Sequence, residues 1–140
     1  MKRQEQVTKK KLKIKKDHRG WLVEILRNED VGIEPFGQIL LTVAKPGQVK
    51  GGHYHKRKTE WYCVIKGTGL LTIINNDSKE QKEHVLGEAS MSLVKISPNN
   101  THFIKNIGKE DMFLLIYINA AFYQSDSDTY EIEPKSKIIT

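Results

Sequence analysis

The sequence predicts an all-β domain, built either as a closed barrel or as a two-sheet jelly roll. Short runs rich in β-branched and aromatic residues recur along the chain, separated by clusters of Gly, Pro, Asn and Asp. No segment shows apolar residues at helical spacing over three turns. A chain of 140 residues, with 38% hydrophobic and 29% charged residues, is most simply one domain with one core.

Turn residues mark the boundaries of the expected strands. Asp17 to Gly20 has a turn composition, and Pro46-Gly47 precedes the strand that carries His53 and His55. Gly67-Thr68-Gly69 predicts a tight hairpin, and residues 31–37 are expected to form a loop. The other strands are expected at residues 21–27, 38–44, 60–65, 70–74, 83–86, 92–96, 101–105, 112–119 and 129–133.

The positive charge belongs to a basic N-terminal arm. Residues 1–16 hold eight Lys and Arg against one acidic residue, which leaves residues 17–140 with 15 basic and 16 acidic residues. Leu12 and Ile14 alternate with lysines, a pattern typical of an exposed edge strand. We therefore expect a basic arm at residues 1–16, a domain at residues 17–140, and no nucleic-acid partner.

The chain also lacks the marks of a membrane or secreted protein. No apolar run approaches the roughly 20 residues of a membrane span, and the lysine-rich start does not resemble a signal peptide. Cys63 is the single cysteine, which excludes an internal disulfide and fits a reducing compartment. These features predict a cytoplasmic protein without a membrane partner.

Two histidines and a glutamate suggest a metal site. Alternate residues of a strand leave by the same face, so His53 and His55 are expected to point together. Glu60 follows five residues after His55. Imidazole and carboxylate groups from neighbouring strands can meet around one divalent cation.

The spacing around these residues resembles the first cupin motif. From Gly47 to Gly67 the chain reads glycine, five residues, His-x-His, four residues, glutamate, six residues, glycine. The second cupin motif is matched more weakly, by His102 and Asn106, with Ser97 at the position where a proline is usual and Asn99 at the position where a glycine is usual. Asn tolerates left-handed backbone angles, so Asn99 can make that turn.

The cupin resemblance implies a single double-stranded β-helix barrel and a metal centre. The implied ligands are His53, His55, Glu60 and His102. Three imidazoles and one carboxylate suit zinc, iron, manganese or nickel, and zinc is favoured because it accepts mixed nitrogen and oxygen ligands.

Flanking motifs narrow the resemblance to sugar-nucleotide cupins. Asp17 to Glu24 matches a D-x-R-G-aromatic-x-x-E pattern, and Gly37-Gln38, Lys58-Thr59-Glu60 and Asp128-Thr129-Tyr130 continue the likeness. Over residues 17–133 the chain resembles the C-terminal cupin (epimerase) domain of the capsular-polysaccharide enzyme CapF. It is more distantly similar to the RmlC-like dTDP-4-dehydrorhamnose 3,5-epimerases and the dTDP-sugar ketoisomerases.

The resemblance implies C-3 epimerisation of a nucleotide-linked 4-keto-6-deoxy sugar through an enolate, in surface polysaccharide biosynthesis. It also implies a homodimer and a separate NAD(P)H-dependent reductase, because the chain has no G-x-G-x-x-G fingerprint. Alternatives are a non-catalytic metal- and sugar-nucleotide-binding cupin, an accessory subunit of a reductase, a sugar ketoisomerase, and an iron dioxygenase.

The proton-moving residue must lie outside the ligand set, because a metal-bound imidazole has no free lone pair. The candidates are Lys58, Tyr62 and Tyr117, each of which also has a structural interpretation as a wall residue. By resemblance, the substrate-binding residues are Arg19, Gln38 and Lys50; cations at Arg19 and Lys50 suit a diphosphate.

Overall fold

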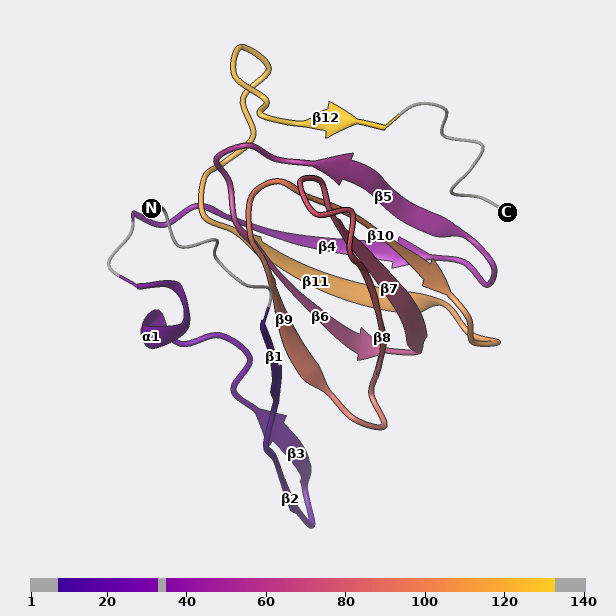
Figure 1. The fold of residues 1–140 in the computed structure, drawn as a ribbon. Helices are drawn as coiled ribbons and strands as arrows, with labels where there is room; N and C mark the ends of the chain where they lie inside the picture. The colour runs from indigo at the N-terminus through magenta and orange to yellow at the C-terminus, as the bar shows by residue number, and fades with distance from the viewer. Residues whose placement is uncertain (1–7, 33–34, 133–140) are drawn as a thin grey trace.

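The computed structural model describes residues 8–32 and 35–132. Two five-stranded antiparallel sheets face each other, and a separate two-stranded hairpin extends from them (Figure 1). The all-β jelly-roll prediction is confirmed. The predicted closure into a barrel is wrong, because the strands pair in two separate sheets.

The first sheet has the order β1-β9-β6-β11-β4. Its strands are β1 (Thr8–Lys11), β9 (Ser92–Ile96), β6 (Glu60–Lys66), β11 (Met112–Ile118) and β4 (Gln38–Ala44). The second sheet has the order β12-β5-β10-β7-β8. Its strands are β12 (Tyr130–Glu131), β5 (Val49–Tyr54), β10 (Asn100–Asn106), β7 (Thr68–Asn75) and β8 (Gln81–Gly87).

The main core lies between the two sheets. Strand β11 shows how it is built: Met112, Leu114 and Ile116 are buried and belong to the core cluster. This follows from the two-residue period of a strand, which sends alternate side chains to one face. The facing sheet contributes Leu71, Ile73, Leu86 and Ile104 to the same cluster.

A second apolar cluster lies on the outer face of the first sheet. Its buried members are Leu12, Trp61, Cys63, Met91, Leu93 and Tyr117. The segment that packs on it contains strands β2 (Ile14–Asp17) and β3 (Gly20–Val23) and one helical turn, α1 (Asn28–Val31). The strand expected at residues 21–27 is therefore shorter than predicted, and α1 lies between it and most of the loop expected at residues 31–37.

The predicted hairpin at Gly67 is also wrong. Strands β6 and β7 belong to different sheets, so the chain crosses from one layer to the other at this residue. Gly67 has a φ of +84°, and a β-carbon there would lie 2.9 Å from the carbonyl oxygen of Asp111. A Gly-x-Gly sequence signals a sharp turn, but it does not specify which strand the chain will pair with next.

The basic arm contributes an edge strand to its own chain, because β1 pairs with β9. Residues 1–7 of that arm lie outside the described residues, as does position 133 of the last predicted strand. In the described part of the chain, no helix is long and apolar enough to cross a membrane.

Candidate metal centre

The four predicted metal ligands converge between the two sheets. His53 lies on β5 and His102 on the neighbouring strand β10, where the two residues are directly paired. His55 follows one residue after the end of β5, and Glu60 begins β6 on the facing sheet. One ligand atom from each residue lies within 4.8 Å of the others.

The histidine nitrogens surround one carboxylate oxygen. Oε1 of Glu60 lies 3.3 Å from Nε2 of His102 and 3.8 Å from Nε2 of His53. Nε2 of His55 makes a still closer contact with the same oxygen. Except for His53, which is partly exposed, these groups are buried, so they lie in a medium where charges interact strongly.

Backbone carbonyls orient two of the rings. Nδ1 of His55 donates to the carbonyl oxygen of Asp128 at 2.7 Å, and Nδ1 of His102 donates to that of Asn100 at 2.9 Å. Because a carbonyl can only accept, the proton of a neutral ring must be on Nδ1, which leaves the Nε2 lone pair facing Glu60. Metal-bound histidines are held in the same way.

The donor set fits a divalent cation. Two imidazole lone pairs facing an ionised carboxylate repel one another unless a proton or a cation lies between them. Nε2 of His102 is buried and has no hydrogen-bond partner among the described residues. A cation such as zinc would accept all these lone pairs at once, so the residues present are suited to hold one.

The charges of Glu60 and His55 depend on each other. Burial alone would raise the pKa of Glu60, but its interactions with His102, His53 and His55 bring it well below its usual value. Burial alone would lower the pKa of His55, but Glu60 and the carbonyl of Asp128 raise it. The carboxylate is therefore ionised at neutral pH.

The cluster opens into a cavity of about 370 Å³. One part of the wall is apolar and comes from Leu40, Ile116, Ile118 and Phe122. The remaining lining residues carry polar groups beside the cluster: Gln38, Lys58, Tyr62 and Thr129.

Two of the three predicted proton-moving residues line this cavity. Tyr62 is buried with its ring edge-on to His102, and burial together with the neighbouring Glu60 raises its pKa well above the usual value. Nζ of Lys58 donates to the carbonyl oxygens of Ser127 at 3.2 Å and Ala121 at 3.3 Å. Tyr62 is therefore a protonated phenol, and Lys58 is tied to residues 121–127.

Tyr117, the third predicted proton-moving residue, is not among the residues that line this cavity. Its side chain belongs to the outer cluster, where its ring packs on Trp61 at 5.6 Å. Its hydroxyl accepts a hydrogen bond from the N–H of Gly37. The neighbours Ile116 and Ile118 take the face that lines the cavity, so Tyr117 points away from it.

The predicted substrate-binding residues occupy three different places. Gln38 lines the cavity, and its side-chain oxygen accepts a hydrogen bond from the N–H of Phe122. Lys50 is exposed on β5, paired opposite Ile104, and does not line the cavity. Arg19 is exposed in the β2–β3 hairpin and pairs with Asp17, at the end of the molecule remote from β5 and β12 (Figure 1).

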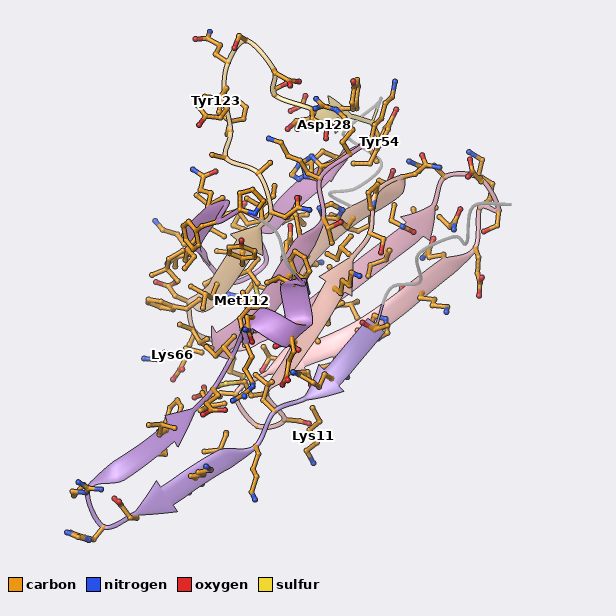
Figure 2. All side chains as sticks on the ribbon, turned by 90° about the vertical axis from the view of Figure 1, so that its left-hand side faces the viewer. Lys11, Tyr54, Lys66, Met112, Tyr123 and Asp128 are labelled. Atoms are coloured by element: carbon orange, nitrogen blue, oxygen red, sulfur yellow. The ribbon has the colours of Figure 1, made fainter. Side chains whose placement is uncertain are left out.

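Sequence reasoning missed the role of Asp128 beside this cluster. Its carboxylate accepts hydrogen bonds from the N–H groups of Lys56, Arg57 and Lys58, each at 3.0 Å. Figure 2 shows Asp128 close to Tyr54, where β12 lies along β5. The only sequence signal was the Asp128-Thr129-Tyr130 motif, which carries no indication of a contact some 70 residues away.

Comparison with known proteins agrees with the fold and the motifs. The model of the polysaccharide biosynthesis C-terminal domain matches residues 15–130. Among solved structures, CapF from Staphylococcus aureus is 30% identical with a TM-score of 0.68, over 87% of this chain and 34% of CapF. The 3'-monoepimerase ChmJ from Streptomyces bikiniensis, solved with dTDP-quinovose, has a TM-score of 0.82 at 16% identity, over 95% of this chain and 72% of ChmJ.

A curated relative carries the same domain in a longer protein. The UDP-2-acetamido-2,6-beta-L-arabino-hexul-4-ose reductase of Pseudomonas aeruginosa is 35% identical over 114 residues, which are 81% of this chain and 29% of the reductase. The chain thus spans about a third of the length of this reductase and of CapF. These likenesses confirm the predicted RmlC-like cupin fold. The chain belongs to the polysaccharide biosynthesis C-terminal domain family.

Proposed function

We propose that this chain is an epimerase that inverts carbon 3 of a nucleotide-linked 4-keto-6-deoxy sugar in surface polysaccharide biosynthesis. The observation that carries the proposal is the common cavity of about 370 Å³, which is lined by His53, His55 and Glu60 of the metal centre together with Lys58 and Tyr62. The names of its relatives, a capsular-polysaccharide protein and a sugar-nucleotide reductase, support the substrate class.

Inversion beside a ketone needs three groups. A base removes the proton from carbon 3, a positive partner stabilises the enolate oxygen, and an acid returns a proton to the other face. A divalent cation, zinc by preference, held by His53, His55, Glu60 and His102 would polarise the carbonyl. The histidines then serve as ligands and take no part in proton transfer.

Tyr62 is the proposed proton donor. The raised pKa keeps its phenol protonated at neutral pH, and a sugar bound in the cavity would lie beside it, because Tyr62 is part of the cavity wall. Lys58 is the proposed base. Backbone carbonyls of Ala121 and Ser127 hold its Nζ at the wall, which limits the freedom of a long side chain before substrate binds.

The apolar wall supports the deoxy-sugar part of the proposal. Leu40, Ile116 and Ile118 present hydrocarbon to the cavity, beside the polar groups that face the cluster. A 6-deoxy sugar has a methyl group in place of a hydroxymethyl group, and burial of such a group against hydrocarbon contributes about 0.8 kcal/mol per carbon.

A second candidate is a non-catalytic partner of a reductase. The relative named as a reductase matches this chain over only 29% of its own length. A cupin that binds the sugar nucleotide and delivers it to a separate reductase would use the same pocket without proton exchange.

Deuterium incorporation tests the proposal directly. Zinc-loaded protein in D₂O is incubated with UDP- and dTDP-linked 4-keto-6-deoxy sugars, and the product is read by mass and by loss of the carbon-3 proton signal. We expect one deuterium at carbon 3 with the wild type, and at least a 100-fold slower exchange with Glu60→Ala. Binding without exchange for every sugar would favour the reductase partner, and neither binding nor exchange would contradict both candidates.

A further inference from the structure

Asp128 is a buried acid that makes no direct contact with the cavity yet is tied closely to the metal centre. It is only 4% exposed. Its carboxylate accepts three backbone N–H groups at 3.0 Å, from consecutive residues 56–58. Burial alone would raise the pKa of Asp128, but these donors and Arg57 lower it, so the carboxylate is charged at neutral pH.

The three donors belong to the link between two ligands. Residues 56–59 connect His55, at the end of the second sheet, to Glu60, at the start of the first. A carboxylate that binds three successive N–H groups acts as a cap, because it satisfies donors that no strand pairs. The path of this link sets the separation of His55 from Glu60, and it also places Lys58 at the cavity.

The main chain of Asp128 acts on His55 itself. Its carbonyl oxygen accepts the Nδ1 proton of His55 at 2.7 Å, and this bond directs Nε2 toward Glu60. Asp128 adopts a φ of +46°, a left-handed conformation that Asp and Asn tolerate better than most residues. Asp128 thus holds the ring of His55 through its backbone carbonyl and holds the turn at residues 56–58 through its side chain.

We propose that Asp128 is a positioning residue of the metal centre, whose carboxylate keeps its own carbonyl on His55 and keeps the 56–58 turn in place. The inference rests on the proposed function, which supplies the metal. The hydrogen bonds on which it depends are made within the protein alone. Without the carboxylate, the three N–H groups of the turn lose their acceptors, and the carbonyl is no longer held against the imidazole.

The matched variants are Asp128→Asn and Asp126→Asn. Asn keeps the tolerance for a left-handed φ, but its amide group presents donors to donors and loses at least one of the three bonds. Asp126 lies in the same segment and is exposed, and its carboxylate pairs with the guanidinium of Arg57. The same substitution there weakens an exposed ion pair but leaves the three backbone N–H donors of residues 56–58 and their acceptor unchanged.

The first readout is the Nδ1 proton of His55, followed by ¹⁵N-resolved NMR with and without zinc. In the wild type and in Asp126→Asn we expect a protonated Nδ1 whose hydrogen exchanges slowly. In Asp128→Asn we expect at least tenfold faster exchange. A wild-type His55 that carries its proton on Nε2 in the metal-free protein would overturn the proposal without any variant, even if Asp128→Asn did not fold.

The second readout is zinc affinity, measured by competition with a chelator. Loss of a residue that orients a ligand typically costs about 10- to 100-fold in metal affinity. We expect a loss of that size in Asp128→Asn and a change below about twofold in Asp126→Asn. Equal affinities in a folded Asp128→Asn, with an unchanged Nδ1 proton, would refute the positioning role.

The two readouts separate this inference from the proposed function. A wild type that binds no zinc would contradict the metal centre, while the Nδ1 exchange in the metal-free protein would still decide the role of Asp128. A wild type that binds zinc but does not exchange carbon-3 hydrogen would contradict the epimerase, and the affinity comparison would stand.

Discussion

Nε2 of His102 lies 3.3 Å from Oε1 of Glu60, yet this ring nitrogen has no hydrogen-bond partner among the described residues. The Asn100 carbonyl accepts a hydrogen bond from the other ring nitrogen, so a neutral ring presents a lone pair to an ionised carboxylate. A buried polar atom without a partner costs about 1–3 kcal/mol. A bound cation would remove that cost, which makes His102 the most informative ligand to change.

His102→Ala should therefore lower zinc affinity by more than roughly 100-fold. A loss of up to that size is typical when a residue that only hydrogen-bonds to a metal ligand is changed. The measurement is metal content after dialysis, with chelator competition for the affinity. His18→Ala is the control, since His18 is exposed in the β2–β3 turn and outside the cluster. Equal zinc content in His102→Ala, His18→Ala and the wild type would contradict the ligand assignment.

Tyr62→Phe should abolish proton return while leaving zinc bound. The phenol is the proposed donor, and a missing acid–base group costs about 10²- to 10⁴-fold in rate. The matched control is Tyr117→Phe, because the hydroxyl of Tyr117 lies on the other face of the sheet and binds Gly37. Formation of the inverted, deuterated product should fall in the first variant and stay within about twofold in the second. A similar loss in both would point to a structural cause.

Gly37→Ala should destabilise the fold. A β-carbon at Gly37 would lie 1.9 Å from the carbonyl oxygen of Ile118, so the backbone must move. The cost should reach at least the ~1–3 kcal/mol typical of overpacking. Gly108→Ala is the control, because its nearest contact would be an ordinary 3.5 Å from a side chain, with an expected change within about 0.5 kcal/mol. Urea unfolding of both variants makes the comparison, and equal midpoints would contradict the steric argument.

Cys63 should resist alkylation in the native protein. Its thiol is buried, and burial raises its pKa to about 11. Because only the thiolate reacts, iodoacetamide at pH 8 should modify the native chain far more slowly than the urea-unfolded chain. The thiol has a higher pKa in the folded protein than the ordinary value of 9.0 that it has in the unfolded chain. Its contribution to stability is therefore fully present below pH 9 and is lost as the pH rises toward 11. Rapid native alkylation at pH 8 would contradict the buried position.

A homodimer is expected from the family resemblance, and β4 is the surface we assign to it. This strand ends the first sheet, and Ile39 and Leu41 are 56% and 57% exposed. An apolar edge strand in water favours association. Light scattering should report twice the 16.1 kDa of the chain.

Leu41→Lys should shift that dimer to a monomer, because it buries a charge in the interface. Val85→Lys, on the exposed face of β8 in the other sheet, should leave the dimer intact. A monomeric wild type would contradict the dimer. A dimer that persists in Leu41→Lys would show that the interface does not lie on β4.

Local sequence signals predicted the strands well. The expected strands at 38–44 and 92–96 match β4 and β9, because β-branched runs bounded by turn residues depend on short-range chemistry. Asn99 adopts the expected left-handed backbone, with a φ of +65°. The same local rules failed at Gly67, where the pairing partner of the next strand is not a neighbour in the chain.

The candidate site was only partly predictable. The motif spacing named the four residues that the structure brings together, and it placed Lys58 and Tyr62 near them. The face taken by Tyr117 depends on register: Ile118 pairs with Glu60 and Ile116 with Tyr62, and directly paired residues share a face. Without that register, Tyr117 could not be told from its inward neighbours.

By itself, the sequence determined the residue types, their spacing and the strand periodicity, because these depend on neighbours in the chain. Only the tertiary structure decided that Glu60 faces His53 and His102 from the opposite sheet, that Arg19 lies apart, and that Asp128 holds the turn after His55. These contacts join residues far apart in the chain, and their geometry follows from how two whole sheets pack.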